Sequence, residues 1–173
     1  TAAVNCPATA AVWGSIWWNF RVKGTATVLG SVLKCRVRRS NTSPVNNTAS
    51  GYAGIADFFR GTDENSVPVN AMWWYNQMNS ATIAEGRNTN ASTLTNTAIT
   101  LDTAQTTLQN FEVEYTEAGT SQVVFLEDAV SKATHTTNIP KTSEMFFYIA
   151  AGTHTATTPT SAPSYTVDSF VLY

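Results

Sequence analysis

The sequence has few charged residues and no basic patch. Charged residues make up 13% of its 173 residues, and the formal net charge is −2. A nucleic-acid-binding domain normally shows a basic stripe or patch on one face. The one basic cluster, Lys34 to Arg39, alternates along a predicted strand, so its charges are expected on both faces. We therefore expect no nucleic-acid partner and interpret the cluster as a solvated strand or a subunit contact.

Long hydrophobic runs and cysteines are also scarce. No stretch of about 18 apolar residues occurs, so no membrane-spanning helix is predicted. The chain starts at Thr1 without a signal-peptide pattern, and we expect this to be a processed or truncated beginning. Cys6 and Cys35 are the only two cysteines. They are compatible with one disulfide bond or with two buried thiols, and the sequence favours neither.

Motifs for nucleophilic, nucleotide and metal chemistry are missing. There is no G-x-S-x-G sequence and no Gly-rich phosphate loop. His135 and His154 have no cysteine or carboxylate at zinc spacing, so both are interpreted as surface loop residues. Asp57, Asp63 and Glu64 come nearest to a calcium site, but calcium needs six to eight oxygen ligands. We expect no cofactor, with calcium as the one alternative.

The residues that are abundant predict an all-β protein. The chain contains 28 Thr, which favours strands, and 14 Ser and 14 Asn, which favour turns. About ten strand-like segments are separated by turns, and no segment keeps a helical period. We predict an antiparallel two-sheet β-sandwich (jelly roll) as a single domain over residues 13–173. Residues 1–12 are predicted to be an arm, exchanged with a neighbouring subunit.

Residues 125–140, "FLEDAVSKATHTTNIP", combine a strand end, an acidic pair and a Thr-rich stretch. This segment is predicted to be a hairpin arm followed by a crossover loop. Pro140 removes a hydrogen-bond donor and favours an extended approach to the next strand. We interpret the segment as a structural part of the sandwich rather than an active site.

The order of several segments resembles one known family. These segments are "IWWNFRVKG", "GYAGIADFF", "AMWWYN", "FEVEYTEAGTSQVVFLED", "EMFFYIAAGT" and "YTVDSFVLY". Their order is similar to that in concanavalin A-like (laminin-G-like) sandwiches of tailed-phage virion surface proteins, over roughly residues 13–173. The resemblance implies a sandwich on the outside of a virion or another extracellular assembly. Asp128-Ala129 stands where the family has Asp-Gly, which puts the positive φ of that turn in doubt.

The stretch "EVEYTE" resembles the acidic motif of one family of retaining glycosidases. Alternate residues of a strand share a face, so Glu112 and Glu114 are expected to lie side by side. The middle position is Glu rather than Asp, Glu117 falls at the turn, and no tryptophan flanks the stretch. We interpret these residues as a solvated acidic face and predict a non-enzymatic protein. A glycosidase acting through Glu112 and Glu117 is the alternative.

Two adjacent tryptophan pairs are the main candidates for contacts. On a strand, one ring of Trp17–Trp18 and one ring of Trp73–Trp74 are expected to point inward and the other outward. The outer rings, together with Tyr75, are candidates for a subunit interface or for carbohydrate contact. Ordinary partial burial explains the same residues.

These observations predict a structural or surface protein of a virion, such as a capsid decoration, head-fibre or tail-fibre module. Its expected partners are copies of itself, other virion or shell proteins and cell-surface glycan. Its expected location is the virion surface or the extracellular space. The alternatives are a subunit of a secreted non-viral filament or surface layer, and a glycan-binding module.

Overall fold

The structure is a computed structural model of the 173-residue chain. It describes residues 2–5, 13–23, 32–41, 49–57, 68–77, 82–104, 107–116, 121–140, 144–153 and 164–172. Within these ranges only the backbone is described for residues 2–50 and 151–172, and for Tyr52, Gln77, Glu144 and Tyr148.

All regular elements in the described residues are strands. They are β1 (Ala2–Asn5), β2 (Trp13–Lys23), β3 (Val32–Asn41), β4 (Ala49–Ala56), β5 (Ala71–Gln77), β6 (Ile83–Asn90), β7 (Thr93–Thr100), β8 (Gln109–Thr116), β9 (Gln122–Glu127), β10 (Val130–His135), β11 (Glu144–Thr153) and β12 (Ser164–Leu172). No helix in this part of the chain is long and apolar enough to cross a membrane.

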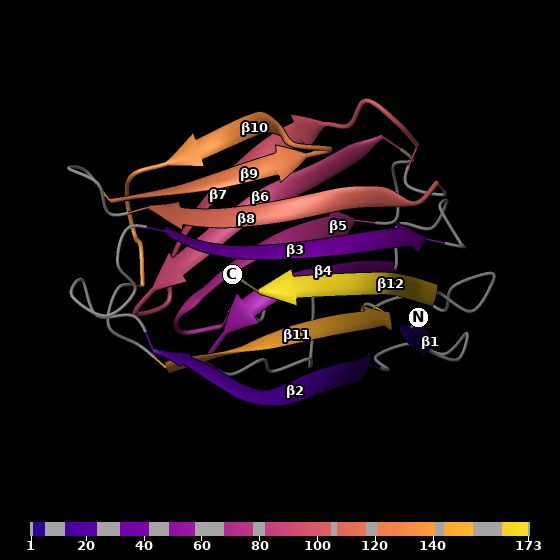
Figure 1. Ribbon diagram of the computed structural model, residues 1–173, viewed down its shortest axis with the longest axis horizontal. Coiled ribbons are helices and arrows are strands. Elements are labelled where there is room, and N and C mark those ends of the chain that lie inside the picture. The colour runs from indigo at the N-terminus through magenta and orange to yellow at the C-terminus, as the bar shows by residue number, and fades with distance from the viewer. Residues whose placement is uncertain are drawn as a thin grey trace.

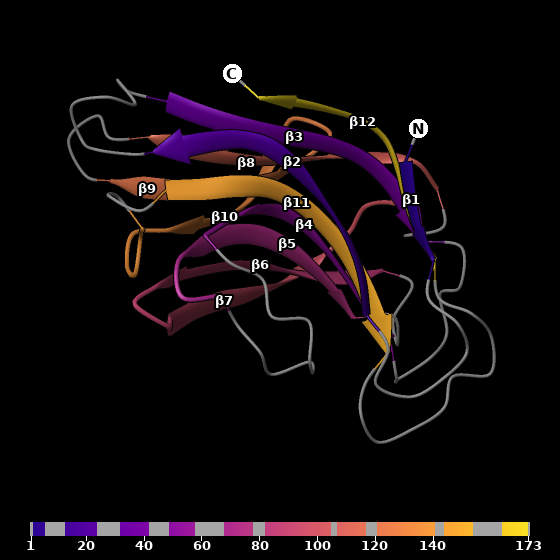
Figure 2. The same cartoon turned by 90° about the horizontal axis from the view of Figure 1, so that it is seen from below.

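The strands form two six-stranded antiparallel sheets (Figure 1). Sheet A has the order β1-β12-β3-β8-β9-β10, and sheet B has the order β2-β11-β4-β5-β6-β7. Figure 2 shows the sheets stacked, with sheet B curved so that its hollow side faces away from sheet A. The predicted antiparallel two-sheet sandwich is confirmed. Residues 125–140 form the predicted hairpin, since β9 pairs with β10 before the chain crosses to β11 in sheet B.

The N-terminal segment contributes a strand to its own chain. Residues Ala2 to Asn5 pair with β12, with Ala2 opposite Val167 and Asn5 opposite Ser164. Exchange of residues 1–12 with a neighbouring subunit stays a prediction.

The interior between the sheets is aromatic around Trp74. This ring lies edge-on to Phe111 and Phe125 of sheet A, at centroid distances of 4.6 and 5.7 Å. Its Nε1–H donates to the backbone oxygen of Glu112 at 3.1 Å, which ties β5 to β8 across the sandwich. Gly86, opposite Trp74 on β6, leaves room for the Phe125 ring: a Cβ there would lie 2.6 Å from it. The packing at the centre of sheet B therefore requires both the large ring of Trp74 and the absence of a side chain at Gly86.

Two hairpins turn without glycine. Residues Ala91–Ser92 join β6 to β7, and Asp128–Ala129 join β9 to β10. Their φ angles are 49° and 64° in the first turn and 48° and 67° in the second. Two-residue loops with both φ angles positive are type I′ turns, which match the twist of a hairpin. The turn that the missing glycine put in doubt is therefore present. Asp128 holds it, because its Oδ1 accepts the backbone N–H and the Nδ2–H of Asn110 at 3.1 and 2.9 Å.

Replacing the left-handed alanine should stabilise the protein. We expect Ala129→Gly to raise the free energy of unfolding by about 0.5–1 kcal/mol, because glycine removes the steric cost of positive φ. The matched control is Ala133→Gly within β10, where added chain entropy should lower stability by about 0.5–1 kcal/mol. The urea unfolding midpoints of the two variants test this prediction. A lower midpoint for Ala129→Gly than for the wild type would show that the positive φ of Ala129 does not destabilise the protein.

Candidate functional site

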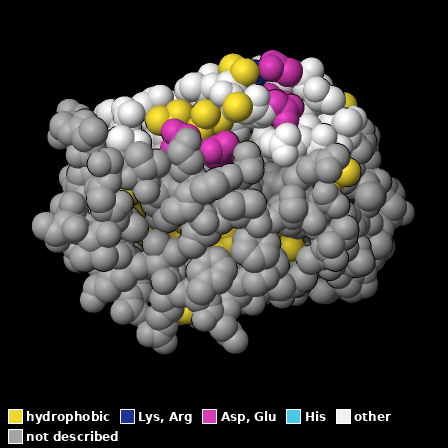
Figure 3. Space-filling view, viewed as in Figure 1, with side chains coloured by type: hydrophobic (Ala, Val, Ile, Leu, Met, Phe, Trp, Pro, Cys, Tyr) yellow, Lys and Arg dark blue, Asp and Glu magenta, His cyan; other side chains and the backbone are white. Residues whose placement is uncertain are grey.

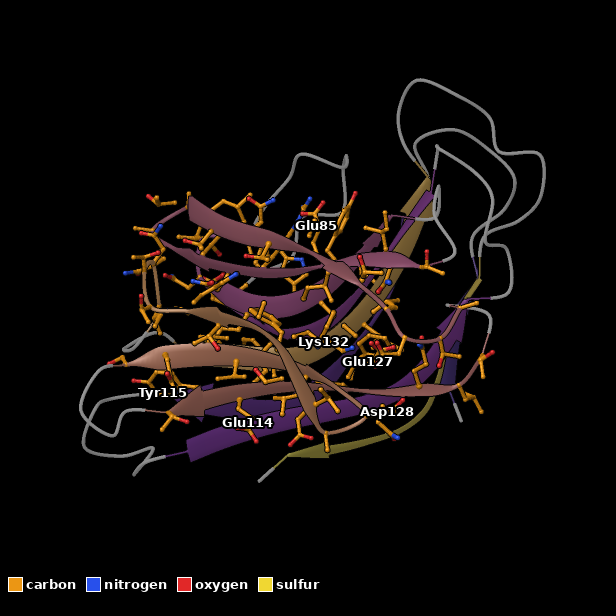
Figure 4. The ribbon with its side chains drawn as sticks, turned by 90° about the horizontal axis from the view of Figure 1, so that it is seen from above. Glu85, Glu114, Tyr115, Glu127, Asp128 and Lys132 are labelled. Atoms are coloured by element: carbon orange, nitrogen blue, oxygen red, sulfur yellow. The ribbon has the colours of Figure 1, made fainter. Side chains whose placement is uncertain are left out.

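The site lies on the face of sheet B that points away from sheet A. Trp74 and Gly86 face Phe125 of sheet A. Side chains alternate along a strand, so their neighbours Trp73 and Tyr75 on β5 and Glu85 and Arg87 on β6 point to the opposite, outer face. The backbone register places Glu85 opposite Tyr75. Figure 4 shows Glu85 on one side of the sandwich and Glu114 on the other.

Four of the outer-face residues form a connected group, here called the polar face: Tyr75, Glu85, Arg87 and Asn96. Oε2 of Glu85 accepts Nε–H of Arg87 at 2.9 Å and Nδ2–H of Asn96 at 3.0 Å. Cζ of Arg87 lies 3.6 Å from the centroid of the Tyr75 ring. The side chains of Arg87 and Glu85 keep 12% and 20% of their surface exposed. Both charged groups are therefore held in one orientation at the protein surface.

This arrangement leaves hydrogen-bonding groups available. Among the described residues, neither the Nη groups of Arg87 nor Oε1 of Glu85 has a partner. Asn96 is exposed on β7, directly opposite Arg87. The polar face can thus donate and accept hydrogen bonds at neighbouring points without first reorganising. None of Glu85, Arg87 and Asn96 was predicted from the sequence. Glu85 and Arg87 are two residues apart, so the sequence could have shown that they share one face of a strand. The sequence does not give the pairing of β6 with β7, which brings Asn96 to the same face.

The second tryptophan pair lies on opposite faces of β5, as predicted, but neither ring is on the surface. Trp74 points between the sheets and is 1% exposed. Trp73 points to the outer face but is also buried, at 0% exposure. Tyr75, at 2%, lies beneath Arg87. Among the described residues, none accepts a hydrogen bond from Nε1 of Trp73. The outer ring of this pair is therefore buried rather than exposed, and the interface or carbohydrate contacts of Trp73, Trp74 and Tyr75 stay predictions.

The remaining predicted contact and disulfide residues are only partly covered. Trp17 and Trp18 lie on β2, and Cys35 lies on β3 opposite Val113. Their side chains, and the whole of Cys6, lie outside the described residues. The disulfide bond and the contacts of the first tryptophan pair stay predictions.

The acidic residues of β8 lie on the outer side of sheet A. Phe111, Val113 and Tyr115 point into the core, so Glu112 and Glu114 point away from it. In register they stand opposite Arg36 and Lys34 of β3, which pairs acidic with basic positions across the sheet. Figure 3 shows acidic beside hydrophobic side chains on the described part of this face. Glu112 is only 7% exposed, so it is not a solvated residue as predicted. Glu117 lies outside the described residues.

A second charged cluster is engaged within the protein. Glu127 is 1% exposed, and its carboxylate accepts Nε2–H of Gln109 at 2.7 Å and the backbone N–H of Asp102. Nζ of Lys132 lies 2.6 Å from Asp102 and 3.4 Å from Glu127, and the bond to Asp102 raises the pKa of Lys132. Figure 4 shows Glu127 and Lys132 together at the edge of the sandwich. Both acidic residues of the pair 127–128 therefore make contacts within their own chain.

The calcium prediction rested on Asp57 and two residues outside the described ranges, Asp63 and Glu64. The carboxylate of Asp57 accepts the backbone N–H and the Nδ2–H of Asn70 at 3.1 and 2.8 Å. The described residues contain no group of three or more His, Cys, Asp or Glu side chains placed to hold a metal ion.

His135 is buried, at 4% exposure, and not the surface residue that the sequence predicted. Its Nδ1 is bonded to Oδ1 of Asn88, and its Nε2 lies 2.9 Å from Oγ1 of Thr97. Nδ2 of Asn88 donates to the carbonyl oxygens of Thr137 and Asn138, which fixes its Oδ1 as an acceptor. The proton of His135 therefore sits on Nδ1, and Nε2 accepts from Thr97. This group joins β10 of sheet A to β6 and β7 of sheet B.

Burial lowers the pKa of His135 below its ordinary value, because the charged ring loses its hydration. The unfolded chain therefore binds this proton more readily than the folded chain. The neutral, buried His135 ring therefore contributes fully to the free energy of unfolding above a pH of about 6.5. This contribution declines as the pH falls below that value toward the folded pKa.

We expect the urea midpoint to fall between about pH 7.5 and pH 5.5, and His135→Asn to remove most of that fall. Asparagine keeps a donor near the place of Nδ1 but does not titrate. His154→Asn is the matched control and should keep the wild-type slope. An unchanged slope in His135→Asn would show that His135 does not cause the pH dependence.

The fold belongs to the concanavalin A-like class of β-sandwiches, and several solved structures share it. The carbohydrate recognition domain of Emp46p, in its potassium-bound form, is 9% identical with a TM-score of 0.67, covering 98% of this chain and 81% of that chain. The legume lectin-like domain from Entamoeba histolytica is 6% identical with a TM-score of 0.65, covering 99% and 82%. Crh5 transglycosylase in complex with NAG is 12% identical with a TM-score of 0.66, covering 98% and 70%. No protein-family model and no curated protein matches the sequence.

These similarities correct one prediction. The protein was predicted to be non-enzymatic because the acidic residues of "EVEYTE" were interpreted as a solvated strand face and no motif for a nucleophile was present. That prediction is wrong, since Crh5 is a transglycosylase with a similar fold and the similar structures are not lectins alone. The concanavalin A-like sandwich is confirmed, whereas no similar structure named above is a virion protein.

Proposed function

We propose that this protein is a glycan-binding module that holds saccharide on the outer face of sheet B. The observation that carries the proposal is the polar face, in which Glu85 fixes both Arg87 and Asn96. The fold also supports the proposal, because two proteins of similar fold are named after carbohydrate recognition or lectins. They are the carbohydrate recognition domain of Emp46p and the legume lectin-like domain from Entamoeba histolytica.

Saccharide fits the chemistry of the polar face. Each sugar hydroxyl donates and accepts, so a binding surface must offer both kinds of group at fixed, neighbouring points. Oε1 of Glu85 is an acceptor, and the Nη groups of Arg87 are donors. Both side chains are already ordered by contacts within the protein, which lowers the entropy lost on binding. Since Trp73 and Tyr75 are buried, hydrogen bonding rather than ring stacking carries recognition.

The predicted self-association, the virion or shell partners and the virion-surface or extracellular location are further proposals. Glycan binding is compatible with each of them, and with a secreted filament or surface layer. A binding face on the outer side of sheet B leaves sheet A available for packing against other subunits. That packing remains part of the proposal.

Binding to a glycan array, followed by calorimetry on the best ligand, tests the proposal. We expect Glu85→Gln to weaken binding about 10- to 100-fold, since hydrogen bonds to a charged group contribute about 1.5–3 kcal/mol. Asn96→Ala should weaken it about 5-fold, because the lost bond is at an exposed position.

The matched control is Glu114→Gln, which changes a carboxylate on the outer side of sheet A and should leave affinity unchanged. Unfolding midpoints show whether each variant stays folded. Equal losses in Glu85→Gln and Glu114→Gln would place binding elsewhere, and an array with no ligand would remove the function.

A further inference from the structure

We infer that the saccharide bound by the polar face carries a carboxylate, as uronic and sialic acids do, and that Arg87 binds it. This inference rests on the proposed function and adds the chemical class of the ligand. It follows from how the guanidinium is held and from which of its donors are left unused.

The guanidinium of Arg87 is fixed on two sides. Nε–H donates to Glu85 at 2.9 Å, and Cζ lies over the Tyr75 ring, 3.6 Å from its centroid. Only 12% of the Arg87 side chain is exposed. A long side chain that is ordered before binding loses little further entropy when a ligand arrives. The contacts with Glu85 and Tyr75 thus prepare Arg87 as a receptor group.

The unused part of the guanidinium is the end that carries Nη1 and Nη2. Neither nitrogen has a hydrogen-bond partner among the described residues. The two outer N–H groups at this end are parallel and coplanar, and their spacing matches the two oxygens of a carboxylate. A sugar hydroxyl engages only one of them at a time. The geometry therefore favours a planar anion over a neutral hydroxyl.

Charge on the outer face is compatible with a bound anion. Glu85 is the only acidic residue among the described outer-face positions of β5, β6 and β7; the others, apart from Arg87, are uncharged. Its Oε2 already faces two N–H donors, from Arg87 and Asn96. A ligand at the Nη end therefore lies on the far side of the guanidinium from the contact between Nε and Oε2.

A further unmatched donor lies on the same face. Trp73 stands directly opposite Arg87 in the β5–β6 register, and its Nε1–H has no acceptor among the described residues. Opposed residues on neighbouring strands have Cβ atoms about 4.5–5.5 Å apart. Trp73 is 0% exposed, so this N–H lies beneath the surface, and the exposed donors for an anion are the Nη groups of Arg87.

The test compares acidic saccharides with their own neutral forms. The probes are oligogalacturonate, oligomannuronate, oligoglucuronate and sialyllactose, each also as its methyl ester, together with neutral and sulfated oligosaccharides. We expect at least one carboxylate probe to bind, and its methyl ester to bind at least about tenfold more weakly, because esterification removes one charge-assisted pair.

The Arg87→Lys variant tests whether binding needs the two parallel N–H groups of the guanidinium or only its positive charge. Lysine keeps the positive charge but loses the parallel donors, so affinity for the acidic probe should fall about tenfold, with the unfolding midpoint close to wild type. Arg38→Lys on β3 of sheet A is the matched control and should bind like wild type. Equal affinity of Arg87→Lys and wild type would overturn the role of Arg87.

The possible outcomes distinguish failure of the carboxylate inference from failure of the proposed glycan-binding function. Binding of neutral glycans alone, or of sulfated glycans alone, with loss in Glu85→Gln, overturns the carboxylate and retains the glycan-binding function. Equal binding of a uronate and its ester has the same meaning. Binding of no probe overturns both. Binding of a carboxylate probe that is lost on esterification and weakened in Arg87→Lys supports both.

Discussion

The position of the Trp74 indole determines what each face of sheet B presents. Its ring contacts Phe111 and Phe125 of sheet A, and its N–H is bonded to the backbone of Glu112. With Trp74 inside, strand alternation sends Trp73 and Tyr75 to the outer face. The antiparallel register then places Glu85 and Arg87 beside them. A slip of one residue along β5 would exchange the two faces, so the same contact fixes both the interior and the polar face.

The sequence predicted those features that depend on local pattern. The expectation that Glu112 and Glu114 share one face of a strand matches β8, and residues 125–140 were correctly expected to form a hairpin. Features that depend on register between distant strands were not predictable. Asn96 joins Glu85 only because β7 pairs with β6 in one register, and His135 is buried only because β10 approaches β6 and β7. Strand alternation gives the direction of Trp73 but not its burial, which depends on its surroundings in the fold.

The carboxylates of this protein differ in what remains available to a ligand. Glu127 is enclosed by Asp102, Gln109 and Lys132, and Glu112 is buried on the side of sheet A. Glu85 is partly exposed and has one oxygen without a partner among the described residues. The similar structures include a carbohydrate recognition domain and a transglycosylase, so the fold does not distinguish their functions. The arrangement around Glu85 is what supports saccharide binding here.

Titration of the ¹⁵N-labelled protein with its tightest glycan tests most directly whether the outer face of sheet B is the binding surface. Trp→Phe variants assign the indole N–H signals of Trp73 and Trp74, which lie on opposite faces of one strand. The account predicts that the Trp73 signal moves with saturation, while the Trp74 signal, bonded to Glu112, stays in place. A Trp73 signal that does not move while signals from sheet A shift would contradict it.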